Sequence, residues 1–215
     1  VTCYDSFNPP PTEQSMSSKN IRNIKAIYEL ASVEEVANGM AWYGVANCVA
    51  ITLAEQYSIP ANQAVGVIAA LSPRNKWTRN LVDAEQLIAA YQAGGAEQAK
   101  LTKVCTFGSN KAKAIKILES GLETLPTALD ILSGPKLREF ASCIAGQDDC
   151  CIDGHAWCIW QGSRVTLADV PSIGVKLRRE IKSDYAQAAA DLGLKAYELQ
   201  AITWVAWRRI HGVTK

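Results

Sequence analysis

The run Ala64-Val65-Gly66-Val67-Ile68-Ala69-Ala70-Leu71 decides the fold class of this chain. A short apolar run of this kind suits either a buried β-strand or a core helix. Pro60 stands just ahead of the run, where proline suits the first turn of a helix, and the run is rich in alanine, which has the highest helix propensity. We therefore expect a core helix over residues 61–71.

Apolar spacing in the rest of the chain is also helical. Leu137, Phe140, Ala141 and Ile144 follow the i, i+3, i+4, i+7 pattern of one helix face, whereas the alternation typical of strands is hardly seen. Glycine and proline breakers divide the chain into expected helices over 20–30, 33–57, 61–71, 77–93, 110–120, 126–132, 135–145, 154–161, 173–192 and 196–210. The sequence therefore predicts an all-α fold.

The expected organisation is one all-α domain over residues 20–215, preceded by a tail over residues 1–19. The tail contains three prolines among polar residues, a composition that cannot bury enough apolar surface to order itself. Within the domain we expect two lobes with a cleft between them. The middle of the chain, about 60–162, forms one lobe, and residues 20–59 and 163–215 form the other.

Composition limits the classes of function. The chain has 215 residues, of which 48% are hydrophobic and 20% are charged, as in ordinary globular proteins, which excludes disordered, collagen-like and coiled-coil classes. Its net charge of +1 means that local basic patches would have to hold any nucleic acid. Seven cysteines, odd in number and without the spacing of secreted scaffolds, predict a reducing, cytoplasmic location.

Neither end of the chain suggests a membrane. The first residues, Val1-Thr2-Cys3-Tyr4-Asp5, lack the basic and apolar regions of a signal peptide. Apolar runs are far shorter than the roughly 20 residues that span a bilayer. We therefore expect no signal peptide and no membrane partner. We also expect that the protein has no cofactor and is a monomer.

Two stretches carry basic residues and no acidic ones. Lys100, Lys103, Lys111, Lys113 and Lys116 lie between residues 98 and 118, and Arg74, Lys76 and Arg79 lie between residues 71 and 80. If either set faces one surface, it could neutralise several phosphates of a nucleic acid. Lysines on solvated helix faces give the same pattern, so both interpretations stay open.

Asp153 is the first candidate for chemistry. It precedes a short amphipathic run in Cys150-Cys151-Ile152-Asp153-Gly154-His155-Ala156-Trp157-Cys158, and an N-cap aspartate there would accept backbone N–H bonds from the first helical turn. A carboxylate held in this way could also stabilise a developing positive charge or orient a nucleophile. Spacing alone favours the capping role.

Lys136 is the second candidate. In Gly134-Pro135-Lys136-Leu137 it falls in the first turn of the preceding helix, where the positive end of the helix dipole disfavours a positive charge. A neutral lysine amine is a nucleophile toward a sugar C1′ or an aldehyde. A surface lysine whose aliphatic stem covers the helix is the alternative.

Together these segments resemble the helix-hairpin-helix DNA glycosylases, the group that includes endonuclease III and the 8-oxoguanine glycosylases. Residues 69–77 match the loop that follows a buried helix in that family, and residues 108–115 match its G-x-x-x-K-A-x-x-I segment. Residues 132–140 match the hairpin, and residues 152–155 match the V-D-x-H segment, which continues in the oxoguanine branch with Trp157, Ile159 and Gln161. Phage-encoded proteins with the same L-S-P and D-G-H segments are also similar.

This resemblance implies a two-lobed glycosylase that acts on a damaged or modified base flipped out of duplex DNA. Asp153 would be the catalytic carboxylate, and Lys136 would lie near the lysine that attacks C1′ and gives a Schiff base, often with strand cleavage. Arg74 and Asn75 would fill the gap left by the base or touch the opposite strand. The implied DNA contacts are Arg74, Asn75, Lys76, Lys111, Lys113, Gly134 and His155.

The chain departs from the family at two motifs. Its hairpin lacks the second glycine of L-P-G-V-G-x-K and is shorter, which changes the phosphate-binding helix terminus and the register of Lys136. The cysteine motif that ligates an iron-sulfur cluster in some members is absent. A non-catalytic DNA-binding protein on the same scaffold is therefore the alternative function, and an unrelated helical interaction protein is a third.

Two further patterns have structural explanations that we favour. Cys143, Cys150, Cys151, Cys158 and His155 cluster in sequence, but no C-x2-C pair is present, so we expect small buried hydrophobic residues and no metal site. The segment 201–209 contains Trp204 and Trp207 and could form an aromatic platform for nucleic acid. It is apolar nearly all round its helix, so we expect core packing.

Overall fold

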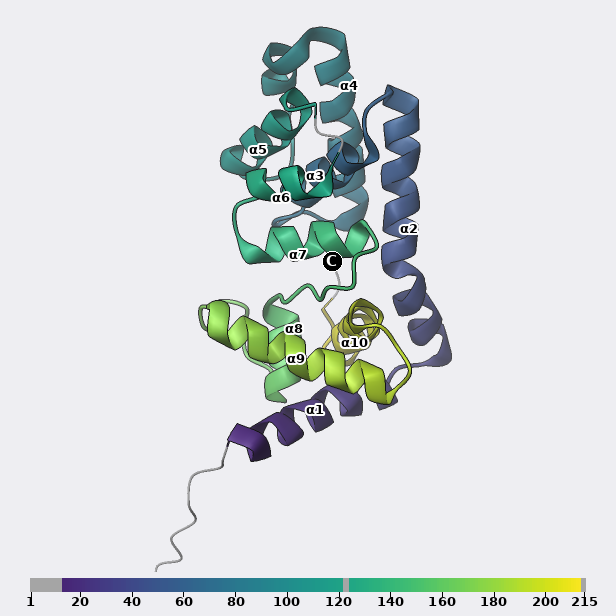
Figure 1. Cartoon of the computed structure of the whole chain (residues 1–215), viewed down its shortest axis with the longest axis vertical. Coiled ribbons are helices and arrows are strands. Elements are labelled where there is room, and N and C mark those ends of the chain that lie inside the picture. Colours follow the sequence, from purple (N-terminus) through teal and green to yellow (C-terminus); the bar gives the residue numbers. More distant parts are fainter. Residues whose placement is uncertain (1–12, 122–123, 214–215) are drawn as a thin grey trace, which may run out of the picture.

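The computed structural model describes residues 13–121 and 124–213, and over these residues the chain forms ten α-helices and no strand (Figure 1). The helices are α1 (Glu13–Glu29), α2 (Val33–Tyr57), α3 (Ala61–Leu71), α4 (Trp77–Leu101), α5 (Gly108–Glu119), α6 (Leu125–Ile131), α7 (Pro135–Ile144), α8 (Gly154–Gln161), α9 (Val175–Asp191) and α10 (Ala196–Ile210). The predicted all-α class is confirmed.

Helix α3 is the core helix expected from the apolar run. Every residue from Gln63 to Leu71 is buried, because α2, α4, α5, α6 and α7 all pack around it. Gln63, the one amide in this stretch, donates from Nε2 to the carbonyl oxygen of Ile117 at 3.0 Å, so its polar end is satisfied inside the core. The position of the connection that follows α3 is therefore fixed by core packing.

Helix α2 runs along one side of the molecule and meets both halves of it (Figure 1). It begins with a capping box, in which the Ser32 hydroxyl accepts from the N–H of Glu35 and the Glu35 carboxylate accepts from the N–H of Ser32. Its crossing with α10 is close, since a Cβ on Gly39 would lie 2.5 Å from the Cα of Ile202. By length and composition α2 could cross a membrane, a test that core helices of soluble proteins also pass.

Two boundaries differ from the predicted ones by more than two residues. Helix α1 begins at Glu13 rather than at residue 20, and residues 1–12 of the predicted tail lie outside the described residues. The prolines behind the tail prediction all precede Glu13, and α1 packs against α8, α9 and α10. Helix α4 continues to Leu101, but Gly94 and Gly95 have non-helical backbone angles, so the predicted break is a kink between two helical segments.

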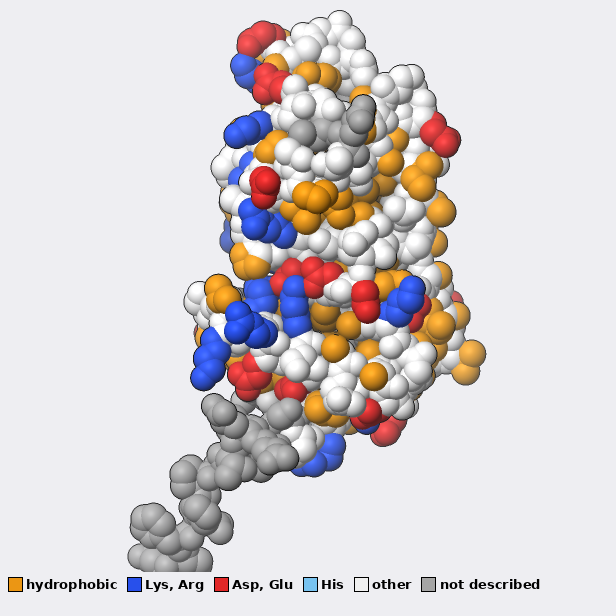
Figure 2. Space-filling view, viewed as in Figure 1, with side chains coloured by type: hydrophobic (Ala, Val, Ile, Leu, Met, Phe, Trp, Pro, Cys, Tyr) orange, Lys and Arg blue, Asp and Glu red, His pale blue; other side chains and the backbone are white. Residues whose placement is uncertain are grey.

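The buried apolar residues form two clusters. The first cluster takes the buried apolar residues of α2, α3, α4, α5 and α7 together with Leu132, Cys151 and Ala201. The second cluster comprises Ile24, Cys150, Ile152, Ala156, Cys158, Ile159, Trp160, Ile181, Tyr185, Ala188, Ala189, Leu199 and Trp207. Figure 2 shows acidic and basic side chains gathered between α7 and α9, where the two clusters meet.

The clusters divide the chain differently from the predicted lobes. Helix α8, expected in the middle lobe, packs its buried residues into the second cluster, and α2, expected in the other lobe, packs Tyr43, Ala46 and Ala50 into the first. Residues 145–153 carry the chain from the first cluster to the second, so α8 lies in the second, and α2 packs against α3 in the first as well as against α10 (Figure 1).

Candidate functional site

A cavity of about 200 Å³ lies where the two clusters meet. Its lining comes from α2, α4, α7, α10, the connection between α3 and α4, and the segment before α8. The lining residues are Trp42, Tyr43, Ser72, Asn75, Trp77, Asn80, Lys136, Phe140, Cys151, Asp153, Gln200, Ala201 and Trp204. It is smaller than the roughly 300 to 1,000 Å³ of pockets for drug-sized ligands, so it suits a ligand of one ring system.

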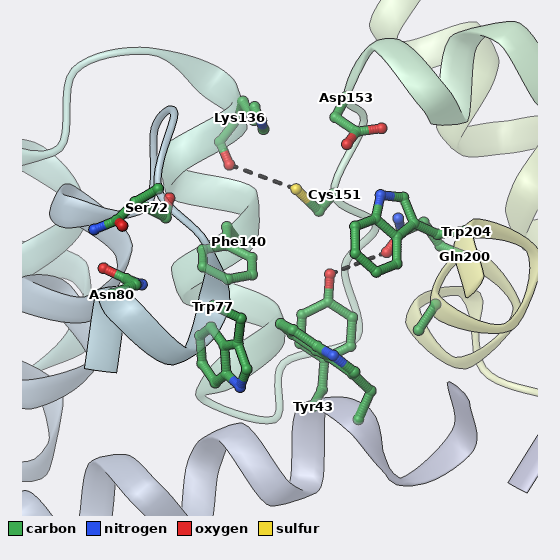
Figure 3. A pocket seen from close by; sticks show the side chains of 13 residues that line it. Tyr43, Ser72, Trp77, Asn80, Lys136, Phe140, Cys151, Asp153, Gln200 and Trp204 are labelled. Atoms are coloured by element: carbon green, nitrogen blue, oxygen red, sulfur yellow. Dashed lines mark hydrogen bonds between the residues drawn. The ribbon is translucent and has the colours of Figure 1, made fainter. Parts of the chain in front are cut away.

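Aromatic rings form most of its walls. Figure 3 shows Phe140 and Trp77 on one side and Trp204 on the other. The ring centroid of Trp42 lies 5.0 Å from that of Trp77 and 5.8 Å from that of Phe140, within the range of favourable aromatic pairs. These rings hold one another in place and leave an apolar slot suited to a planar ligand.

Polar atoms occur at defined points on these walls. The hydroxyl of buried Tyr43 donates to Oε1 of Gln200 at 3.0 Å, a contact between residues 157 positions apart. Asn80 donates from Nδ2 to the carbonyl oxygen of Ile68 at 3.0 Å, and its Oδ1 is buried without a hydrogen-bond partner. A few fixed polar groups on an apolar wall are typical of sites that orient a small ligand.

Asp153 has the capping role that its spacing predicts. Its Oδ1 accepts a 2.9 Å hydrogen bond from the backbone N–H of Ala156 in the first turn of α8. The side chain also lines the cavity, and the residue is half-buried. The cap therefore anchors one oxygen and leaves the carboxylate facing the cavity, so the two roles weighed for this residue are compatible.

Lys136 and Asp153 lie at the same end of the cavity (Figure 3). Lys136 is the second residue of α7, after Pro135 at the first helical position, and is exposed. Gly134 precedes them with φ at +98°, a backbone conformation that favours glycine. The sequence-predicted pair of a carboxylate and an amine is thus brought together although the hairpin is shorter than the family pattern.

A groove of about 750 Å³ continues from the cavity and shares Asn75, Trp77 and Trp204 with it. Three of the expected DNA contacts, Asn75, Lys76 and His155, line this groove. Arg164 and Arg208 line it as well, and the Arg208 guanidinium lies 4.3 Å from the ring centre of Trp204. The groove thus combines three cationic side chains with tryptophan rings, and the acidic Asp169 and aliphatic residues complete its lining.

The connection between α3 and α4 supplies the other residues predicted at 74–76. Asn75 donates from Nδ2 to the carboxylate of Asp83 at 2.9 Å, and its Oδ1 is buried without a hydrogen-bond partner. Arg74 is exposed, has φ at +56° and lies 5.2 Å from the ring centre of Phe107. Arg74 is not among the residues that line the cavity or the groove.

Lys111 and Lys113 lie apart from this site on α5. The Lys111 amine donates to the backbone carbonyl of Lys100, and the Lys113 amine donates to Oδ1 of Asn110 at 3.2 Å. Neither residue is among those that line the cavity or the groove. Their predicted role in DNA binding stays a prediction.

Sequence reasoning missed several lining residues. Gln200 and Trp204 are four positions apart on α10, so they share one helix face. The expected core packing of the 201–209 segment holds for Trp207, which is 5% exposed, but Trp204 is half-buried and lines both the cavity and the groove. The i, i+4 spacing of Gln200 and Trp204 was the sequence signal that could have placed both side chains on one helix face.

The cysteines near this site are buried. Cys143, Cys150, Cys151 and Cys158 are free thiols with little exposure, as expected of small hydrophobic residues. Burial raises the pKa of the Cys150 and Cys151 thiols well above the ordinary value. Over residues 13–121 and 124–213, no group of three or more His, Cys, Asp and Glu side chains is arranged to hold a metal ion.

Comparison with known proteins places the chain in a family. The model of the family of unknown function DUF7178 matches residues 8–211. No curated protein and no solved structure matches the chain.

Proposed function

The chain belongs to DUF7178, a family of unknown function, and we propose that it is a DNA glycosylase that removes a damaged or modified base flipped out of duplex DNA. The observation that carries this proposal is the aromatic cavity that Asp153 and Lys136 both line. The proposal includes the two-lobed arrangement of helix-hairpin-helix glycosylases. Two hydrophobic clusters with a cavity at their junction support that arrangement.

The cavity would hold the extruded base. Stacking of a base on an aromatic side chain is worth about 1 to 3 kcal/mol, and extrusion costs a few kcal/mol of unstacking and unpairing. Phe140, Trp77 and Trp204 supply apolar ring surface from two sides (Figure 3). Stacking in this cavity could therefore offset the cost of extrusion.

Asp153 and Lys136 would act on the sugar of that nucleotide. As the bond from C1′ to the base nitrogen breaks, its electron pair leaves with the base and positive charge develops on the sugar. The Asp153 carboxylate stabilises this charge. The Lys136 amine, after giving up a proton to water, would attack C1′. The C1′–O4′ bond then breaks, with a proton passing from the nitrogen to O4′, and leaves a Schiff base that permits strand cleavage by β-elimination.

The groove next to the cavity would contact the DNA strand. Lys76, Arg164 and Arg208 offer positive charge along it, with His155 at the start of α8. Phosphate contacts of this kind set the position of a nucleic acid without selecting its sequence. This local set of charges explains how a chain with a net charge of only +1 could hold DNA.

The test is base release from duplex oligonucleotides that each carry one damaged or modified base. In a parallel reaction sodium borohydride would reduce the Schiff base to a stable protein–DNA adduct. We expect adduct formation with the unmodified protein and its loss in Lys136→Gln. Lys116→Gln, which changes an exposed lysine of α5, is the matched control and should form the adduct normally.

Each alternative has its own outcome. Base release without any adduct would make the enzyme a glycosylase that uses water, with Asp153 activating it. An adduct that survives in Lys136→Gln would assign the attack to another amine, with Lys111 the next to test. Binding of DNA without base release from any substrate would favour the non-catalytic DNA-binding protein, and no binding at all would refute the nucleic-acid function.

A further inference from the structure

Residues 149–153 connect the first cluster to the second, and Asp153 is the last residue of this connection. Asp153 caps α8 through one oxygen, but the cap alone does not fix where the connection lies relative to α7. Cys151 makes one contact between this connection and α7, since its Sγ lies 3.7 Å from the carbonyl oxygen of Lys136. Ile152, which lies between Cys151 and Asp153, has both its backbone N–H and its backbone carbonyl hydrogen-bonded to side chains.

Glu139 and Arg178 make those two contacts. Glu139 on α7 is 4% exposed, and its Oε2 accepts a 3.0 Å hydrogen bond from the N–H of Ile152. Arg178 on α9 donates from one Nη1 both to Glu139 Oε2 at 2.5 Å and to the carbonyl oxygen of Ile152 at 3.0 Å. One carboxylate and one guanidinium thus hold the residue that directly precedes Asp153.

A second cation completes the group. Lys182, one helical turn after Arg178 on α9, lies 2.9 Å from Oε1 of Glu139 and 2.5 Å from Oδ1 of Asp149. The Glu139 carboxylate is therefore shared between two cations and one backbone N–H. The contacts join α7, α9 and both ends of the 149–153 connection.

Stability alone is a weak explanation for this arrangement. Glu139 lies on the same helix as the buried residues Leu137 and Ala141. The desolvation of buried ion pairs often offsets their attraction, so that apolar residues of similar size serve equally well. What apolar side chains cannot do is to bond both the N–H and the carbonyl of one chosen residue. The group is thus suited to fixing a geometry.

We infer that Glu139 and Arg178 are positioning residues that hold the backbone of Ile152 and thereby keep the Asp153 carboxylate facing the cavity. They act through Ile152 and do not line the cavity themselves. The inference rests on the proposed glycosylase function for its catalytic consequence. Its geometric part, the restraint of residues 152–156, stands without that function.

The chain contains a matched control for this pair. At the start of α2, Glu35 also accepts a backbone N–H, that of Ser32 at 2.9 Å, and pairs with Arg209 at 2.7 Å. Arg209 in turn donates to the backbone carbonyl of Leu30 at 2.7 Å. The chemistry is the same, but the restrained residues lie in the α1–α2 connection and none of them lines the cavity.

The experiment compares Glu139→Ala and Glu139→Gln with Glu35→Ala and Glu35→Gln in the full chain. Base release is measured under single turnover, DNA affinity by titration, and hydrogen exchange at the amides of Ile152 and Ala156. We expect Glu139→Ala to lower base release by at least about tenfold, the scale of a misplaced catalytic group, with DNA affinity changed less than about twofold. Its Ile152 and Ala156 amides should exchange faster than in the unmodified protein.

The variants separate positioning from a purely structural role. Glu139→Gln can still accept from Ile152 and should recover part of the lost rate, whereas the Glu35 variants should leave rate and both amides unchanged. If Glu139→Ala does not fold, Glu139→Gln and Arg178→Lys carry the comparison by rate and exchange. Unchanged base release and Ala156 exchange in folded Glu139 variants would overturn the inference.

Failure of the proposed function gives a different result. The unmodified protein would then release no base from any probe. Exchange at Ile152 and Ala156 would still report the restraint, so faster exchange in the Glu139 variants alone would support the geometric inference.

Discussion

Charged side chains have different surroundings at the junction of the two clusters and at the periphery of the molecule. At the junction, Asp153 and Lys136 line a cavity and Glu139 is buried among cations. At the periphery, here Lys111 and Lys113 of α5 and the Glu35–Arg209 pair, each of these charges has a hydrogen-bond or ion-pair partner away from the cavity, as when Lys111 donates to the carbonyl of Lys100. The difference teaches that a charged residue becomes a candidate for chemistry where several elements converge on a cavity, and that pairing between elements is not enough.

The two acid-free basic stretches of the sequence show this directly. The 72–77 connection follows the fully buried α3, so core packing carries Ser72, Asn75 and Trp77 to the cavity wall. The lysines of 100–116 lie on and before a helix whose other face is buried in the first cluster. The two stretches have the same pattern of charge in the sequence. Of the two, the stretch at 72–77 lines the cavity together with residues of α2, α7 and α10.

The largest effect that should separate the two regions is that of Asp153→Asn. The amide keeps the shape and part of the cap, so the loss of stability should be about 1 kcal/mol or less. Base release should fall by at least about a hundredfold, the scale of losing one electrostatic contribution to a transition state, while DNA affinity persists. Single-turnover base release and thermal unfolding measure the two effects, and Lys116→Gln at the periphery serves as control. Equal rates in Asp153→Asn and the unmodified protein would leave Asp153 as a helix cap alone.

A smaller effect concerns the salt dependence of DNA binding. Each phosphate contact contributes about 0.9 to the slope of log affinity against log salt concentration. We expect the double variant Lys76→Ala/Arg164→Ala in the groove to lower that slope by about 1 to 2 units, and Lys111→Ala/Lys113→Ala to lower it less. Titrations at several salt concentrations measure the slopes. A larger change of slope in the α5 double variant than in the groove variant would contradict this prediction. It would place the DNA-binding surface at the periphery.

The smallest effect is the pH dependence of stability at the two glutamates. The hydrogen bond from Arg209 lowers the pKa of Glu35 below its ordinary 4.5, whereas burial raises the pKa of Glu139 above it. Glu35 therefore contributes stability above pH 4.5 that is lost as the pH falls through its lowered pKa. Glu139 contributes stability below pH 4.5 that is lost as the pH rises through its raised pKa.

Thermal unfolding of Glu35→Gln and Glu139→Gln beside the unmodified protein measures this difference. On acidification from neutral pH, the Tm of the unmodified protein should fall relative to Glu35→Gln and rise relative to Glu139→Gln. Shifts of the same sign for both variants would contradict the contrast between Glu139 at the junction, where burial dominates, and Glu35 at the periphery, where the hydrogen bond from Arg209 dominates.

Local sequence determined the helices and their caps. Pro60 and the alanine-rich run specify α3, and Asp153 is the N-cap of α8 as its place before an amphipathic run predicts. These features depend on residues within one or two helical turns, where propensity and capping act. The same locality explains the errors, because composition alone did not show that α1 begins at Glu13.

The tertiary structure alone decided what those helices build. Tyr43 and Gln200 meet across 157 positions of sequence, and Ile152 is held by Glu139 and Arg178 from two different helices. Such contacts depend on how α2, α7, α9 and α10 pack, and no local preference specifies that packing. The sequence by itself therefore determined the helical class and the two candidate residues Asp153 and Lys136, whereas the cavity that joins them arises only where the two clusters meet.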